Sequence, residues 1–162
     1  MNTFGTYAAI SALLGSALIG GIFFAFSSFV MIALARLPSA EGINAMQTIN
    51  VTVLTPSFLG VYMGTAVLSL IVFVLAIQNW DSPATLWFAA GALLYIVGTF
   101  LVTGLGNVPL NNQLAAVTAS EWDSVGIWEH YLDRWTVLNT IRTVAALLAA
   151  LMFTIGLLRQ GS

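Results

Sequence analysis

Four long stretches of this chain carry no charged side chain: residues 1–35, 42–80, 82–120 and 143–158. A helix that crosses the hydrocarbon core of a bilayer needs about 20 apolar residues, and the first three stretches are longer than that. The chain is 59% hydrophobic and 6% charged, whereas roughly a quarter of the residues of a soluble domain are charged. So few charges could not cover a water-soluble globule. We therefore expect an integral membrane protein whose main partner is the lipid bilayer.

The most apolar segments predict an all-α fold, a four-helix transmembrane bundle that forms a single four-span domain over residues 1–162. The expected spans are about 8–34, 54–77, 85–106 and 136–158. The first is too long for the apolar part of a signal peptide and has no basic leader, so we expect it to be retained. Four spans put both termini of this multi-pass protein on one side of a plasma or inner membrane. The few arginines leave its orientation open.

Two connections are expected to be helical. The first follows the first span, where helical spacing predicts a short amphipathic helix over 39–50, with Ile43, Met46, Gln47 and Asn50 near one another. The second is the long connection 112–134, expected to hold one or two interfacial helices between the third and fourth spans. Its aromatic residues suit the headgroup level: Trp122, Trp128 and Tyr131. Pro109 is expected to stop the third helix, and Asn107 to cap it in a left-handed conformation.

Polar residues gather at one end of the expected bundle. In an antiparallel bundle, the end of the first span, the start of the second, the end of the third and the start of the fourth lie together. That end holds Gln47, Asn50, Asn107, Asn111, Asn112, His130, Asn139 and Arg142. The other end offers only Asn79, Asp81 and Arg159. This asymmetry predicts a polar pocket at the connection-rich end.

Arg142 is the most informative single residue. It continues a row with spacings of 4, 3, 4 and 3 that places five residues on one helix face: Trp128, Leu132, Trp135, Asn139 and Arg142. An ionisable group inside a span usually faces the bundle interior or a cavity, although a long side chain near a helix end can instead reach the headgroups. The neighbouring Asn139 favours the interior. A guanidinium beside amides suits a phenolate, an enolate or a carboxylate.

An aromatic run in the first span leaves two interpretations open. Its members are Phe23, Phe24, Phe26 and Phe29. They could line a flat apolar pocket, but lipid-facing or core packing is the commoner role of such residues.

Several classes of chemistry are excluded or disfavoured. The chain has no cysteine and one histidine, which is a poor ligand set for zinc or haem, so we expect no metal and no cofactor. Glu129 and Asp133 flank His130 at helical spacing, but a solvated helix face is favoured over a metal site. His130 could act as a general base or be an ordinary interfacial histidine. A net charge of −2 disfavours nucleic acid, and a homo-oligomer remains open.

Four segments resemble the anthrone-oxygenase-like membrane family: FFAFSSFVMIALARLP, AMQTIN, GNVPLNNQLA and WEHYLDRWTVLNTIRT. The resemblance runs from about residue 23 to 143. It implies a cofactor-independent monooxygenase that converts an anthrone to an anthraquinone, although many bacterial members are uncharacterised. The positions it carries over are Asn107, Asn111, Asn112, Trp135, Asn139 and Arg142. One departure is Thr140, which stands where the family often has a histidine. If that histidine takes part in the reaction, this chain has lost the reaction or uses His130.

These patterns lead to one site hypothesis and two rivals. The expected catalytic residues are Arg142, Asn139, Asn107 and His130. The expected substrate-binding residues are Asn50, Asn111, Asn112, Trp128, Tyr131 and Trp135. The expected ligand is a small aromatic or lipophilic acid, flat and phenolic or anthrone-like. The rivals are a non-enzymatic membrane scaffold or accessory subunit, and a carrier of a small apolar acid.

Overall fold

The computed structural model describes residues 2–121 and 124–160, and within these ranges the chain is helical and contains no strand. The first long helix consists of α1 (Thr3–Ala25), a π-helical segment η1 (Phe26–Val30) and α2 (Met31–Ala35). It is followed by α3 (Ser39–Thr52) and α4 (Pro56–Gln78). The third long helix consists of α5 (Thr85–Leu93), the π-helical segments η2 (Leu94–Leu101) and η3 (Thr103–Asn107), and α6 (Val108–Ala115). The last is α7 (Ser124–Arg159).

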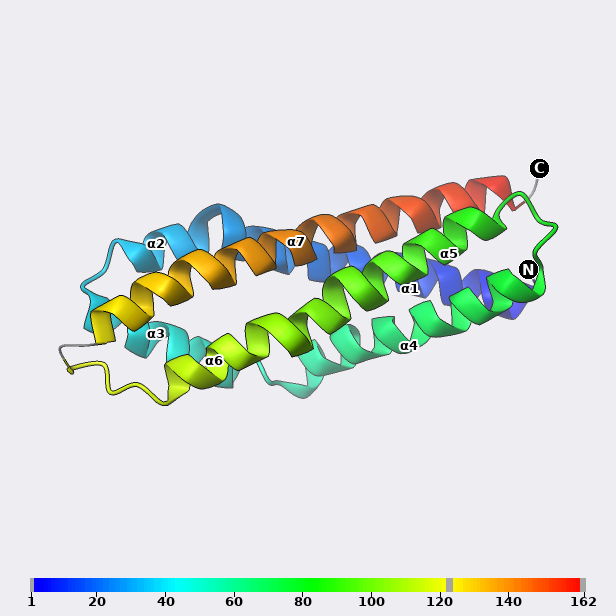
Figure 1. Ribbon diagram of the computed structural model, residues 1–162. Helices are drawn as coiled ribbons and strands as arrows, with labels where there is room; N and C mark the ends of the chain where they lie inside the picture. Colours follow the sequence, from blue (N-terminus) through cyan, green and yellow to red (C-terminus); the bar gives the residue numbers. More distant parts are fainter. Residues whose placement is uncertain (1, 122–123, 161–162) are drawn as a thin grey trace.

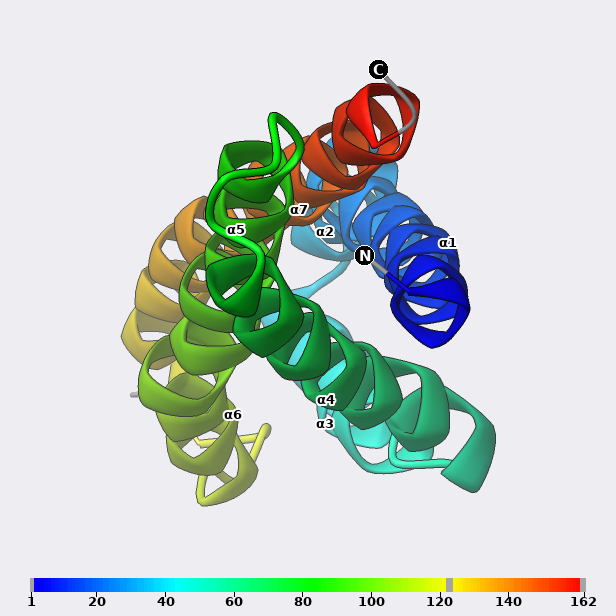
Figure 2. The same cartoon turned by 90° about the vertical axis from the view of Figure 1, so that its right-hand side faces the viewer.

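Among the described residues, four helices are long and apolar enough to cross a membrane: Thr3–Ala35, Pro56–Gln78, Thr85–Ala115 and Ser124–Arg159. The predicted four-helix transmembrane bundle is therefore confirmed. The first helix packs against α4 and α7, and α5 packs against the same two helices, so that the four surround one core (Figure 2). Both termini and the α4–α5 connection lie at one end, and the other connections lie toward the opposite end (Figure 1).

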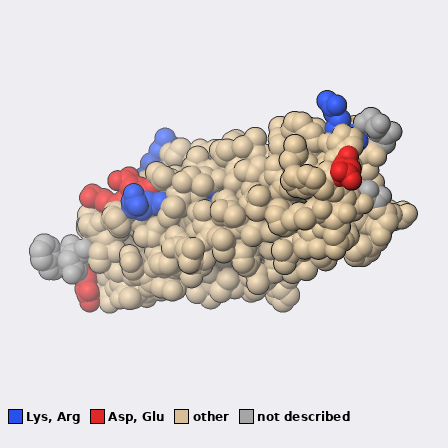
Figure 3. All heavy atoms as spheres, turned by 45° about the vertical axis from the view of Figure 1, so that its right-hand side comes forward, with Lys and Arg blue, Asp and Glu red and all other residues tan. Residues whose placement is uncertain are grey.

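On the face shown in Figure 3, charged side chains gather at the two ends of the bundle and leave a broad surface between them almost free of charge. This distribution fits a hydrocarbon core flanked by two headgroup layers. The four apolar helices and this uncharged surface define a multi-pass membrane protein.

The predicted amphipathic helix after the first span is α3. It begins after Pro38, buries Gly42, Ile43 and Met46, and packs against α2, α6 and α7. In Figure 1, α3 lies beyond the point where α4 begins, so the connection-rich end contains three long helices and α3. A Cβ atom on Gly42 would lie 2.8 Å from a ring carbon of Trp128, so the close approach of α3 to α7 requires glycine at this position.

The third helix differs from the expectation at Pro109. It does not stop there but continues to Ala115, and Asn107 has φ −71° and ψ −38°, which is right-handed and not a left-handed cap. The physical reason is the π-helical segment η3, in which Val108 donates its N–H to the carbonyl of Thr103, five residues earlier. A regular α-helix would set the proline ring against the carbonyl four residues before it. The wider turn displaces those carbonyls and accommodates Pro109.

The helical residues of the connection 112–134 belong to the two helices on either side of it, α6 and α7. Its first residues belong to α6, which ends at Ala115, and its last belong to α7, which begins at Ser124. The predicted interfacial position of Trp122 lies outside the described residues. Because α7 begins at Ser124, Trp128 and Tyr131 belong to the first turns of the fourth long helix, and both are buried.

Two clusters of buried side chains form the core. One is rich in alanine and includes Ile19, Phe23, Tyr62, Phe88 and Phe153. The other lies at the connection-rich end and includes Met31, Ile43, Met46, Trp128 and Trp135. Residues of both clusters line one cavity.

Candidate functional site

Arg142 lies near the middle of α7, and only 4% of its surface is exposed. Its Nη2 donates to Oδ1 of Asn139 at 2.7 Å and its Nη1 donates to Oγ1 of Thr103 at 3.1 Å. The guanidinium carbon lies 4.1 Å from the ring centroid of Phe23 and 5.2 Å from that of Trp135. No acidic side chain of residues 2–121 or 124–160 pairs with it. Arg142 thus faces the bundle interior and does not reach the headgroups.

Asn139 holds this guanidinium in place. The residue is fully buried, and its Nδ2 donates to the carbonyl of Phe23 and to Oγ of Ser27, both at 2.7 Å. A carbonyl can only accept and a guanidinium can only donate, so the orientation of this amide is fixed by its neighbours. Every hydrogen-bonding group of the Asn139 side chain is engaged. It therefore ties α7 to the first helix and orients Arg142.

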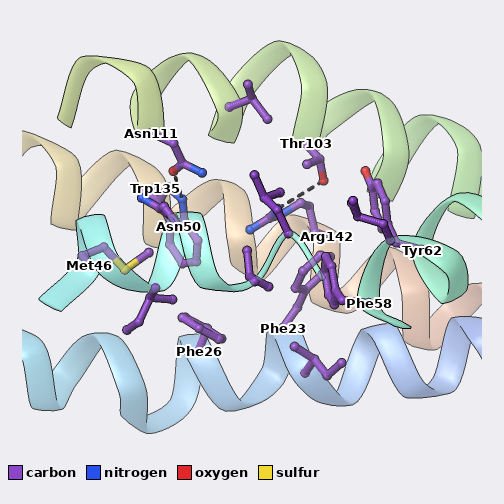
Figure 4. Close-up of a pocket in the computed structure, with 16 residues that line it drawn as sticks. Phe23, Phe26, Met46, Asn50, Phe58, Tyr62, Thr103, Asn111, Trp135 and Arg142 are labelled. Atoms are coloured by element: carbon purple, nitrogen blue, oxygen red, sulfur yellow. Dashed lines mark hydrogen bonds between the residues drawn. The ribbon is translucent and has the colours of Figure 1, made fainter. Parts of the chain in front are cut away.

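A cavity of about 190 Å³ lies beside Arg142. Its walls are mostly aliphatic and aromatic, and its polar lining consists of Asn50, Tyr62, Thr103, Asn111, Trp135 and Arg142 (Figure 4). All of these residues belong to the described part of the chain, and none is a carboxylate or a histidine. A dry cavity of about 150 Å³ is enough to bind benzene. The space beside Arg142 therefore suits an aromatic ring system bearing an anionic group.

A second set of hydrogen bonds closes the same end of the bundle. Oδ1 of Asn111 accepts from Oη of Tyr131 at 2.9 Å and from Nε1 of Trp135 at 2.8 Å. Oη of Tyr131 in turn accepts from Nδ2 of Asn50 at 3.3 Å. The rings of Trp128, Tyr131 and Trp135 form a stack with centroid separations of 5.7 and 6.1 Å. These contacts join α3, α6 and α7.

The structure brings together part of the predicted site. Asn50, Asn111, Trp135 and Arg142 line the cavity. Trp128 and Tyr131 support its wall through the aromatic stack, and Asn139 lies behind Arg142. Asn107 is buried and donates from Nδ2 to the carbonyl of Trp135 at 3.2 Å, while its Oδ1 has no partner among the described residues.

Two predicted residues lie elsewhere. His130 and Asn112 are exposed and do not line the cavity. His130 comes two residues after the buried Trp128 on α7, so its side chain points to the opposite side of the helix, away from the buried face. Thr140, at the position where the family often has a histidine, is also exposed, and its hydroxyl lies 3.0 Å from that of Ser27. Among the described residues that line the cavity, none is a histidine or a carboxylate that could act as a base.

Sequence reasoning missed Tyr62 and Thr103. The aromatic run of the first helix is expected either to line a pocket or to face lipid or the core, and the structure shows both. Phe23 and Phe26 line the cavity, whereas Phe24 and Phe29 are exposed. Thr103 donates to the carbonyl of Thr99 at 2.8 Å and so offers its oxygen to Arg142.

A repeat of four residues could have identified Thr103. The third helix has a polar residue at each fourth position: Tyr95, Thr99, Thr103, Asn107 and Asn111. In an α-helix each such step turns about 40° past a full turn, so that Tyr95 and Asn111 would lie on nearly opposite faces. In the structure all five point inward and make interhelical hydrogen bonds. The wider turns of η2 and η3 keep this row on one face.

In residues 2–121 and 124–160, no three histidine, aspartate or glutamate side chains lie close enough to hold a metal ion. The chemistry that the described site offers is that of a buried guanidinium, several amides and aromatic rings.

The fold and the site together define a multi-pass membrane protein whose helices enclose a cavity with a buried cation. Residues 58–152, more than half of the chain, match the family model of anthrone oxygenases, and the chain belongs to this family. The matched region contains Thr103, Asn111 and Arg142 but begins after Phe23 and Asn50. Neither the comparison with curated proteins nor the comparison with solved structures gives a match.

Proposed function

We propose that this protein is a cofactor-independent monooxygenase that binds a flat, apolar, acidic substrate from the membrane in the cavity beside Arg142. The observation that carries the proposal is a guanidinium that is buried, lacks an acidic partner in the described chain, and borders a mostly apolar cavity. A buried charge of this kind is costly unless it is paired. A substrate anion supplies the missing counter-charge. Membership of the anthrone oxygenase family supports an anthrone-like phenol.

Arg142 favours the ionised form of such a substrate. The guanidinium donates hydrogen bonds to the substrate oxygen and so stabilises an enolate or phenolate. Because no carboxylate or histidine lines the cavity within the described residues, the proton passes to water at the headgroup level. Asn139 and Asn107 act from behind the cavity wall as positioning residues, Asn139 through Arg142 and Asn107 through Trp135.

The oxidation then balances without a further reductant. Loss of a proton from an activated methylene group leaves a carbanion whose charge is delocalised onto the oxygen beside Arg142. Dioxygen takes one electron from this carbanion, and the two radicals combine to form a carbon–oxygen bond. The resulting peroxide is protonated and loses water, which leaves a carbonyl. One methylene and one dioxygen thus give one carbonyl and one water, and the apolar walls shield the intermediate from solvent.

The test compares three forms of the protein in lipid nanodiscs supplied with an anthrone. Oxygen uptake and anthraquinone absorbance are measured against nanodiscs without protein, because anthrones also react slowly with air. We expect the parent to exceed this background. Arg142→Met should lose about 10²-fold in rate, as in other enzymes that lose one donor to an oxyanion. Arg134→Met, on an exposed position of the same helix, is the matched control and should behave as the parent.

The outcomes separate the rival functions. Parent-like oxygen uptake by Arg142→Met refutes the proposed role of the guanidinium. Binding of the anthrone without oxygen uptake above background refutes the oxygenase and favours a carrier of apolar acids. Absence of both binding and uptake favours the scaffold or accessory subunit.

A further inference from the structure

The amides at the end of the cavity formed by α3 and α6 have fixed orientations. Nε1 of Trp135 can only donate a hydrogen bond, so the atom of Asn111 that faces it at 2.8 Å must be the oxygen. Oδ1 of Asn111 also accepts the hydrogen of Tyr131 at 2.9 Å. The oxygen of Tyr131 can then only accept, and it receives Nδ2 of Asn50. The two amides therefore cannot flip without breaking this chain of bonds.

This arrangement leaves one donor and one acceptor for a ligand. Nδ2 of Asn111 and Oδ1 of Asn50 have no hydrogen-bond partner among the described residues, and neither belongs to the fully buried atoms that lack a partner. Both residues line the cavity. Figure 4 shows the nitrogen of Asn111 turned toward the side where Thr103 and Arg142 lie. The two amides are joined through Oη of Tyr131 and line the same cavity, so this donor and this acceptor can serve one hydroxyl group, which accepts from one and donates to the other.

We propose that Asn111 and Asn50, oriented by Tyr131 and Trp135, form a subsite for a hydroxyl group, so that the cavity selects aromatic anions carrying a second oxygen function away from the anionic one. The inference rests on the proposed function, because Arg142 must bind the anionic group of the same ligand. Asn111 and Asn50 are specificity-determining residues. Tyr131 is a positioning residue, since it does not line the cavity and acts only through the two amides.

Two probes of nearly equal size test the subsite. The probes are 2-naphthoate and 6-hydroxy-2-naphthoate, which share the carboxylate and differ in one distant hydroxyl. Their dissociation constants are measured by calorimetry with the whole protein in nanodiscs. We expect the parent to bind the hydroxylated probe about tenfold more tightly, the size of one well-placed hydrogen bond. The ratio of the two constants is the readout, because partial misfolding lowers both affinities alike.

Three variants locate the preference. Asn111→Leu removes the donor and should bring the ratio to about one. Tyr131→Phe removes only the hydroxyl that orients the amides and should lower the ratio while retaining binding of 2-naphthoate. Asn112→Leu, an adjacent exposed position outside the cavity, should retain the parent ratio.

The results distinguish this inference from the function on which it rests. If the parent binds both probes equally, or if Asn111→Leu and Tyr131→Phe keep the parent ratio, the subsite is overturned. If in addition Arg142→Met still loses both probes, the anion site stands without it. If the parent binds neither probe, both proposals are overturned.

Discussion

Replacing Asn139 by aspartate places a carboxylate where an amide now orients Arg142. The amide oxygen accepts from Nη2 of Arg142 at 2.7 Å, so the new group forms an ion pair with the guanidinium inside the protein. The charge of Arg142 is then neutralised before any ligand arrives. We expect this variant to lose its affinity for an aromatic anion while the bundle remains folded.

The size of the loss follows from the geometry. A ligand anion that accepts from the guanidinium at an ordinary hydrogen-bond length of about 2.9 Å would lie about 5 Å from the new carboxylate. At an effective dielectric constant of about 20 the two like charges repel by about 3 kcal/mol, which weakens binding roughly 10²-fold.

Folding should change much less. One aspartate oxygen faces the Phe23 carbonyl in place of the present N–H bond, which costs about 1–3 kcal/mol. The ion pair with Arg142 offsets a cost of that size, and Ser27 can donate its own hydroxyl hydrogen to the carboxylate.

The assay pairs 2-naphthoate with its neutral analogue 2-naphthamide. Calorimetry in nanodiscs should give a roughly 10²-fold weaker constant for the anion in Asn139→Asp and an unchanged constant for the amide. Thermal unfolding, followed by near-ultraviolet circular dichroism, checks that the variant is folded. Equal affinity of parent and variant for 2-naphthoate would show that the charge of Arg142 does not bind the anion, and the reasoning would then be refuted.

Four further variants test the packing. Gly98→Ala should destabilise the bundle by about 1–3 kcal/mol, because its Cβ would lie 2.5 Å from that of Ala145. The control Gly104→Ala, with no neighbour within 4 Å among the described residues, should be neutral or stabilising by up to about 1 kcal/mol. Equal melting temperatures of the two variants would contradict the close approach of Gly98 to Ala145. Phe23→Leu removes the ring at 4.1 Å from the Arg142 guanidinium and should cost about 1 kcal/mol, visible as lower stability and weaker 2-naphthoate binding. Pro109→Ala should change stability by less than about 1 kcal/mol, whereas a gain near 3 kcal/mol, typical of removing a proline from a regular helix, would argue against the wide turn.

The sequence predicts the features that depend on charge and on simple helical periodicity. The charge-free stretches locate the four long helices, and the row that includes Trp135, Asn139 and Arg142 correctly indicates a buried guanidinium. These predictions succeed because the row lies on α7, a regular α-helix throughout its length.

The predictions that fail concern helix geometry and side-chain direction. Pro109 and the inward row through Thr103 depend on π-helical turns, which residue spacing interpreted at 3.6 residues per turn cannot reveal. His130 is a candidate because an imidazole can act as a base, but its position on α7 relative to the buried residues places it on the exposed face of the helix. Tyr62 lines the cavity with Arg142 because α4 packs beside the third helix, and residue spacing within one helix does not show this contact.

The π-helical segment η3 gives the chain between Thr103 and Asn111 one residue more than a regular α-helix would use for the same turns. Removing one residue from this segment, for example Gly104, would allow a regular α-helical turn to form. Asn111 would then keep roughly its direction toward the cavity, whereas a deletion in the regular helix α7 would turn all later residues by about 100°. The cost of the deletion would fall on Pro109, whose ring would meet the carbonyl four residues before it. In a library of natural or mutated sequences, loss of one residue from this segment should therefore be accompanied by replacement of Pro109.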